Sequence, residues 1–128
     1  MGQQGSIEVE MHSADVAVVT LRGEHDLETQ PRVSAALVAA GTCRHVVVDL
    51  SACTFVDSSL IATLLHAARA LGERGGTLPL VVGPEARSIR RTLDLMGVLT
   101  ILPPHDSRSS ALGSISGEAP PSARRRAA

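Results

Sequence analysis

Hydrophobic and polar residues alternate at the start of the chain as they do in half-buried β-strands. Within residues 7–12, the apolar side chains of Ile7, Val9 and Met11 alternate with polar ones, which is the period of a strand covered on one face. A second strand is predicted over residues 16–22, after a turn of only three residues. Two strands joined so closely indicate an antiparallel hairpin.

Downstream of the hairpin, helix-like and strand-like runs alternate. Apolar residues at helical spacing predict three helices, over residues 29–40, 60–71 and 83–96. Mostly apolar runs predict three strands, over residues 45–50, 78–82 and 98–102. A short last helix is predicted over residues 106–115. The alternation favours an α/β fold, with a mixed, mostly parallel sheet of about five strands and helices packed on it.

The length of 128 residues is enough for one domain and not for two. We expect the folded domain to span residues 7–115. Residues 1–6 are predicted to be a flexible N-terminus, and residues 116–128, rich in Pro, Ser, Ala and Arg, a disordered C-terminal tail. A domain of this size buries about two-thirds of its unfolded surface, so it does not depend on disulfides or metal.

Composition excludes several function classes. Lysine is absent, which rules out a lysine-dependent phosphate loop or Schiff base. The formal net charge of -1, with Phe55 as the only aromatic residue, argues against nucleic-acid binding. Cys43 and Cys53 match no common metal spacing and are interpreted as reduced, small hydrophobic residues. With no apolar stretch long enough for a membrane span and no signal peptide, we expect a cytoplasmic protein that does not contact membranes.

The sequence Asp57-Ser58-Ser59 stands between strand-like residues and the predicted helix over residues 60–71. Three interpretations are open: a plain helix cap, a catalytic nucleophile, or a phosphorylation site, because helix N–H groups there stabilise an anion. A hydrolase nucleophile elbow needs flanking glycines, as in G-x-S-x-G, and these are absent. Among the histidines, only His25 is expected at the same end of the sheet, which is weak support for a triad.

The loop before the first helix is dense in acidic residues, with Glu24, His25, Asp26 and Glu28 close together. Neighbours in one loop rarely converge on a single ion. We therefore interpret this loop as solvated, with Asp26 helping to cap the following helix. Neither a phosphate-binding glycine motif nor a metal-ligand spacing is present, so no cofactor and no metal are expected.

Three segments together resemble bacterial anti-sigma factor antagonists of the STAS family. Residues 47–59, V-V-D-L-S-A-C-T-F-V-D-S-S, resemble its signature of a strand ending in D-L-S, a turn, F-x-D-S-S/T-G and a helix. Residues 21–27, L-R-G-E-H-D-L, resemble its L-x-G-E-L-D. Residues 84–98 resemble its third helix and the strand that follows. The order and spacing of the matches make the resemblance specific over residues 7–115.

The resemblance implies a partner switch rather than an enzyme. Ser58 would be phosphorylated by an anti-sigma factor that is also a serine kinase, with Ser59 as the fallback acceptor. The unphosphorylated form would bind the anti-sigma factor and release the sigma factor, and a serine phosphatase would reverse the modification. The expected partner-binding residues come from two loops at one end of the sheet: Gly23, Glu24, His25, Asp26, Asp57, Ser58, Ser59 and Leu60.

The sequence departs from the family pattern at two of these positions. Leu60 stands where the family usually has glycine, and His25 where it usually has leucine. The bulk of Leu60 has three possible consequences: it enters the core, it narrows the choice of kinase, or phosphorylation is lost and only binding remains. The alternative function is a non-switching STAS scaffold in a signalling or lipid-transport assembly. A hydrolase ranks third.

Overall fold

The computed structural model describes residues 5–115, so the predictions for residues 1–4 and 116–128 lie outside the described residues. The strands are β1 (Ser6–Met11), β2 (Val16–His25), β3 (His45–Val56), β4 (Leu80–Val81) and β5 (Pro104–His105). The helices are α1 (Gln30–Ala40), α2 (Ser58–Glu73), α3 (Arg87–Leu95), α4 (Val98–Ile101) and α5 (Arg108–Ile115). None of these helices is long and apolar enough to cross a membrane.

Within the described residues, the strands form one sheet in the order β1-β2-β3-β4-β5. The first pair is antiparallel and the other three are parallel, which confirms the predicted hairpin and the mixed, mostly parallel sheet. β1 begins at Ser6, one residue earlier than predicted. The α/β fold class is therefore confirmed.

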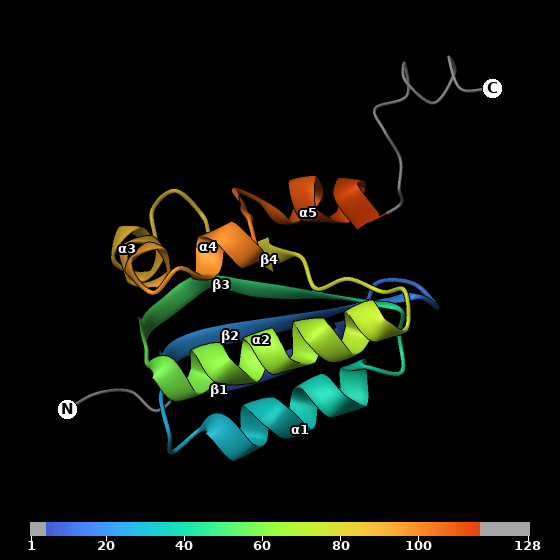
Figure 1. Cartoon of the computed structure of the whole chain (residues 1–128), viewed down its shortest axis with the longest axis horizontal. Coiled ribbons are helices and arrows are strands. Elements are labelled where there is room, and N and C mark those ends of the chain that lie inside the picture. Colours follow the sequence, from blue (N-terminus) through green and yellow to red (C-terminus); the bar gives the residue numbers. More distant parts are fainter. Residues whose placement is uncertain (1–4, 116–128) are drawn as a thin grey trace, which may run out of the picture.

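Helices cover both faces of the sheet (Figure 1). The larger core places Val33 and Leu37 of α1 and Leu64 of α2 against one face. On the other face, α5 packs Ala111 against Val16, Val18, Val47 and Val81 of the strands. Since β3 is covered on both sides, all of residues 46–50 are buried, as the mostly apolar run predicts.

The β2–β3 pairing continues well past the predicted strand ends and places the loops that matter for function. β3 runs to Val56 and not to Leu50, and β2 runs to His25. The parallel pairing has two register shifts, and beyond them it continues to the pair of His25 and Val56. Gly23 stands at the second irregularity with φ of 80°, a left-handed conformation that favours glycine. The segments after β2 and β3 therefore leave the sheet side by side.

The prediction of a strand over residues 98–102 is wrong. Val98–Ile101 is a helical turn, α4, and the Leu102 N–H donates to the Val98 carbonyl. Gly97 has φ of 77° and ends α3 as the sequence predicts. The chain then turns Val98 into the core. A short apolar run has the same appearance in a buried helix as in a buried strand, so tertiary packing decided this segment.

Two other predicted boundaries are also wrong. The third helix begins at Arg87 rather than at residue 83, because Gly83 starts a turn in which its carbonyl accepts from the Ala86 N–H. β4 contains only two of the predicted residues 78–82. The last strand is β5, which lies at the edge of the sheet. Proline has no N–H to donate, and an edge strand tolerates this at Pro104.

Arg108, the first residue of α5, joins the helix to three strands. Its guanidinium donates to Asp49 Oδ2 of β3 at 2.8 Å, to Thr20 Oγ1 of β2 at 2.5 Å and to Glu10 Oε1 of β1 at 3.1 Å. Asp49 is only 8% exposed, and a buried carboxylate needs such partners. Burial raises the pKa of Asp49, but hydrogen bonds from Arg108 and Ser51 outweigh it and hold that pKa below its usual value.

Replacing Arg108 with Gln should lower the free energy of unfolding by about 2 kcal/mol, because Asp49 loses a charged partner. Since the pKa of Asp49 is depressed in the folded protein, this contribution is present at neutral pH and is lost as the pH falls below about 4. Urea unfolding at neutral and acid pH measures both effects. Arg69→Gln on the exposed side of α2 is the control, and equal losses in the two variants would contradict the role of Arg108.

Candidate functional site

The turn between β3 and α2 is a capped helix N-terminus. The backbone of Asp57 is extended, and Oδ1 of its side chain accepts from the N–H groups of Ser59 at 3.0 Å and Leu60 at 3.1 Å. The Ser59 hydroxyl donates to the same oxygen at 2.6 Å. Of the three interpretations of this turn, the helix cap is therefore confirmed, with Asp57 as the capping residue.

The second carboxylate oxygen of Asp57 ties this turn to the neighbouring loop. Oδ2 accepts from the Leu27 N–H at 3.1 Å, so one side chain holds the β2–α1 loop against the start of α2. Burial raises the pKa of Asp57, but the hydrogen bonds from the Ser59 hydroxyl and three backbone N–H groups outweigh it and lower that pKa. Asp57 is thus ionised at neutral pH, and both of its carboxylate oxygens accept hydrogen bonds from the protein.

The two serines of the turn differ in availability. Ser58 is exposed, and its hydroxyl makes no hydrogen bond within residues 5–115. Ser59 is half-buried, and its hydroxyl is already bound to Asp57. A hydroxyl that an enzyme reaches from solution must be exposed and not already hydrogen-bonded. The Ser58 hydroxyl meets both conditions, and the Ser59 hydroxyl meets neither.

Leu60 and His25 were predicted to bind a partner, but their side chains are buried. Leu60 is 0% exposed and belongs to the main core, so of the three consequences considered for its bulk, entry into the core is the one found. His25 is also 0% exposed and is covered by Gly5, where an added Cβ would lie 2.3 Å from the ring. Neither side chain is available to a partner, because each fills space inside the domain.

Both ring nitrogens of His25 have local structural partners. Nδ1 lies 3.0 Å from Thr29 Oγ1, and Nε2 lies 3.1 Å from the Arg22 carbonyl oxygen. A carbonyl only accepts, so Nε2 carries a proton. Burial lowers the pKa of His25 below its usual value. The ring of this histidine is hydrogen-bonded to neither Ser58 nor a carboxylate among the described residues, which leaves the nucleophile interpretation without its base.

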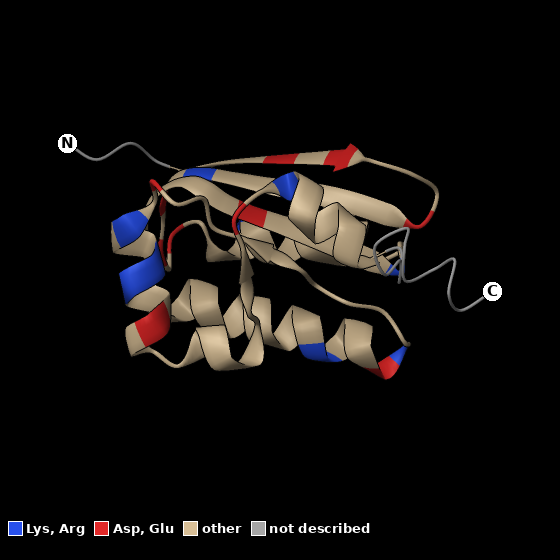
Figure 2. Cartoon of the chain, turned by 90° about the horizontal axis from the view of Figure 1, so that it is seen from above, with Lys and Arg blue, Asp and Glu red and all other residues tan. Residues whose placement is uncertain are grey.

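The remaining predicted residues lie along the end of β2 and in the loop after it, with Gly23 opposite Cys53 and Glu24 opposite Phe55 of β3. Gly23, Glu24 and Asp26 are half-buried in the β2 end and the following loop. Figure 2 shows the acidic residues of these loops at the same end of the molecule as the arginines of α3. No group of three His, Cys, Asp or Glu side chains within residues 5–115 is arranged to hold a metal ion.

Sequence reasoning missed two apolar side chains at this end of the sheet. Leu27 is 71% exposed on the loop held by Asp57, and Phe55 is 48% exposed at the end of β3. Leu27 was detectable as a lone large hydrophobic residue within a polar loop. Phe55 was not, because its exposure depends on what packs beside the end of β3.

Replacing Asp57 with Ala should lower the free energy of unfolding by about 1 kcal/mol, since the α2 cap is lost. Because the pKa of Asp57 is depressed, the difference from the wild type should shrink as the pH falls below about 4. Denaturant unfolding across this pH range measures the effect. Glu28→Ala, a change of an exposed acid on the adjoining loop, is the matched control, and a similar loss there would argue against a specific cap.

Comparison with known proteins agrees with this geometry. A curated anti-sigma F factor antagonist of Paenibacillus polymyxa is 30% identical over 112 residues, covering 84% of this chain and 93% of the relative. The crystal structure of an anti-sigma factor antagonist from Mycobacterium paratuberculosis superimposes with a TM-score of 0.78 at 28% identity, covering 88% of this chain and 95% of that one.

A more distant structure shares the fold. The phosphorylated form of the Bacillus cell fate determinant SpoIIAA has a TM-score of 0.66 at 19% identity, covering 86% of this chain and 99% of that one. Residues 9–103 of this chain match the family described as "Mlab, STAS domain". Because this match spans most of the chain and the curated relative covers 84% of it, the chain belongs to the STAS domain family.

Proposed function

We propose that this protein is an anti-sigma factor antagonist whose binding to an anti-sigma factor is switched off by phosphorylation of Ser58. The observation that carries the proposal is the free, exposed Ser58 hydroxyl at the capped N-terminus of α2. The relatives from Paenibacillus and Mycobacterium, which are anti-sigma factor antagonists, support the general role. In this role the protein is a substrate of a serine kinase and a phosphatase, and not itself an enzyme.

The local charge explains how a phosphate would act as a switch. Phosphorylation adds about -1.5 to -2 charges at neutral pH, and the helix N-terminus tolerates them locally. Asp57 is ionised beside Ser58, and Asp26 lies in the adjoining loop. A partner that covers this surface would have to desolvate all of that charge, at a cost of several kcal/mol without a matching cation. Binding is therefore expected to be lost.

Leu27 and Phe55 are the apolar side chains that the unphosphorylated surface would present to a partner. Both are large, exposed and apolar, and Leu27 is held in place through its N–H by Asp57. Apolar anchors surrounded by polar groups are typical of the energetic centre of a protein interface. The proposed surface consists of Leu27 and Phe55 with Ser58 and its acidic neighbours, and it leaves out the buried side chains of His25 and Leu60.

Ser58→Ala should abolish phosphorylation by the cognate anti-sigma factor kinase with ATP, whereas Ser59→Ala should still be labelled, because only Ser58 is free. Mass spectrometry of the labelled protein identifies the acceptor. Equal labelling of wild type and Ser58→Ala would overturn the assignment.

A phosphomimic tests the switch itself. Ser58→Asp should bind the anti-sigma factor at least tenfold more weakly than the wild type does. Undiminished binding would favour the non-switching scaffold instead.

Leu27→Ser should weaken binding of the unphosphorylated protein to the anti-sigma factor by about tenfold or more, the effect expected for an interface anchor. Phe55→Ser should act in the same direction. Ile101→Ser, which removes an exposed apolar side chain from α4, is the matched control. Calorimetry of the three variants measures the difference, and a control that weakens binding equally would refute this surface.

A further inference from the structure

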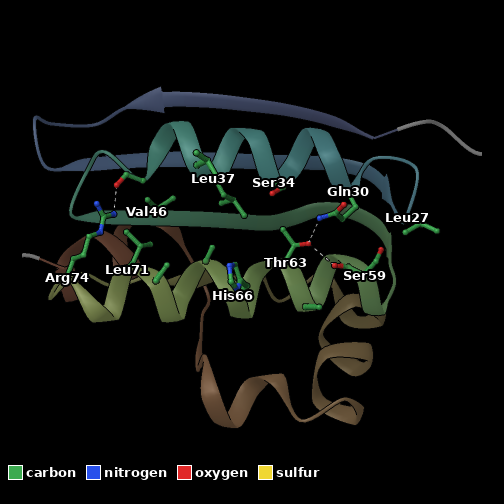
Figure 3. A pocket seen from close by; sticks show the side chains of 15 residues that line it. Leu27, Gln30, Ser34, Leu37, Val46, Ser59, Thr63, His66, Leu71 and Arg74 are labelled. Atoms are coloured by element: carbon green, nitrogen blue, oxygen red, sulfur yellow. Dashed lines mark hydrogen bonds between the residues drawn. The ribbon is translucent and has the colours of Figure 1, made fainter.

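An open groove runs between α1 and α2, above Val46 of β3 (Figure 3). Its volume is about 560 Å³, within the range of cavities that hold small molecules. It extends from Gln30 at the start of α1 to Gly41 at its end. At a rise of about 1.5 Å per residue, that is a trough roughly 16 Å long.

The walls of the groove are largely apolar, and the apolar side chains that α2 contributes to them are mostly alanines. Leu37 of α1 and Leu71 of α2 line the groove and are buried in the main core. Above them, the lining side chains include Ala62, Ala67 and Ala70 of α2, which are too short to fill the space. An aliphatic ligand would cover this surface and remove it from water.

Polar groups lie at both ends of the groove, with Ser34 and His66 between them, and the two ends differ. At one end, Gln30 Nε2 donates to Thr63 Oγ1 at 3.0 Å, and Thr63 donates to the Ser59 carbonyl at 2.9 Å. These groups satisfy one another. At the other end, the Arg74 guanidinium donates to the Gly41 carbonyl across the two helices.

Arg74 has a positive charge and no ion-pair partner in the described part of the chain. Within residues 5–115, the arginines in ion pairs are Arg22, Arg90 and Arg108, and no carboxylate lies within 4.0 Å of Arg74. A guanidinium binds a carboxylate through two parallel hydrogen bonds. The groove therefore combines an aliphatic trough with a cationic end, which is complementary to an amphiphile with one anionic head.

The geometry points to a binding site for an aliphatic monocarboxylate, with its chain along the alanine wall and its carboxylate on Arg74. The length of the trough suits a medium-chain acid such as decanoate. The groove shares Ser59 and Leu27 with the region around Ser58. Binding of the acid to the isolated chain needs neither a kinase nor an anti-sigma factor, so this inference can fail or succeed independently of the proposed function.

Titration of the ¹⁵N-labelled chain with decanoate, below its micelle concentration, tests the site by NMR. Saturable shifts should appear at groove residues such as Thr63, His66 and Arg74. Octanoate should bind about fifteenfold more weakly, since each buried methylene contributes about 0.8 kcal/mol. Shifts scattered over the surface, or no saturation, would overturn the proposal.

Variants of groove residues test the apolar trough and the charge of Arg74 separately. Ala67→Leu and Ser34→Leu, which fill the trough from opposite helices, should each abolish decanoate binding. Ala39→Leu, on the exposed part of α1 outside the lining, should not. Arg74→Gln should weaken decanoate about tenfold and leave decanol unchanged. Binding by the filled variants equal to that of Ala39→Leu would refute the trough, and equal loss of decanol would refute the role of Arg74.

Discussion

The carboxylate of Asp57 is the interaction on which the candidate site depends. One oxygen closes the first turn of α2, and the other holds the backbone of Leu27. Because a single ionised group makes all these bonds, the position of the turn and that of the neighbouring loop are coupled. Ser58 stays free because Asp57, and not a serine, caps the helix. The same arrangement thus stabilises the helix and leaves a hydroxyl open to modification.

The pairing of β2 with β3 makes that arrangement possible. The loops after these strands meet because the parallel ladder resumes beyond two irregularities and ends at His25 and Val56. The left-handed backbone of Gly23 permits the second of them. Buried His25 then fills the space under Gly5 and binds Thr29. The departure from the family pattern at this position is therefore accommodated inside the domain, as is that of Leu60.

On the opposite face of the sheet, Arg108 attaches the start of α5 to the strands, just as Asp57 attaches the start of α2 to the β2–α1 loop. It brings one charged group to acceptors on β1, β2 and β3 and pairs the buried Asp49. Asp49 and Ser51 are the D and S of the D-L-S motif, and both are structural. Ser51 accepts from the Gly83 N–H at 2.8 Å and so anchors the loop that follows β4. Part of the family signature therefore encodes the fold and not the contact with a partner.

Local sequence was enough to establish the strand and helix alternation as far as α3, the hairpin, the glycine after α3 and the position of the serine turn. These features depend on hydrophobic period, on left-handed glycine and on capping chemistry, which act over a few residues. The tertiary structure decided that residues 98–101 are helical, that β3 continues to Val56, and that Leu60 and His25 point inward. It also decided that Arg108 meets Asp49, that Phe55 is exposed and that α1 and α2 leave a groove. Each of these outcomes depends on which distant segments pack together, and no pattern of neighbouring residues records that.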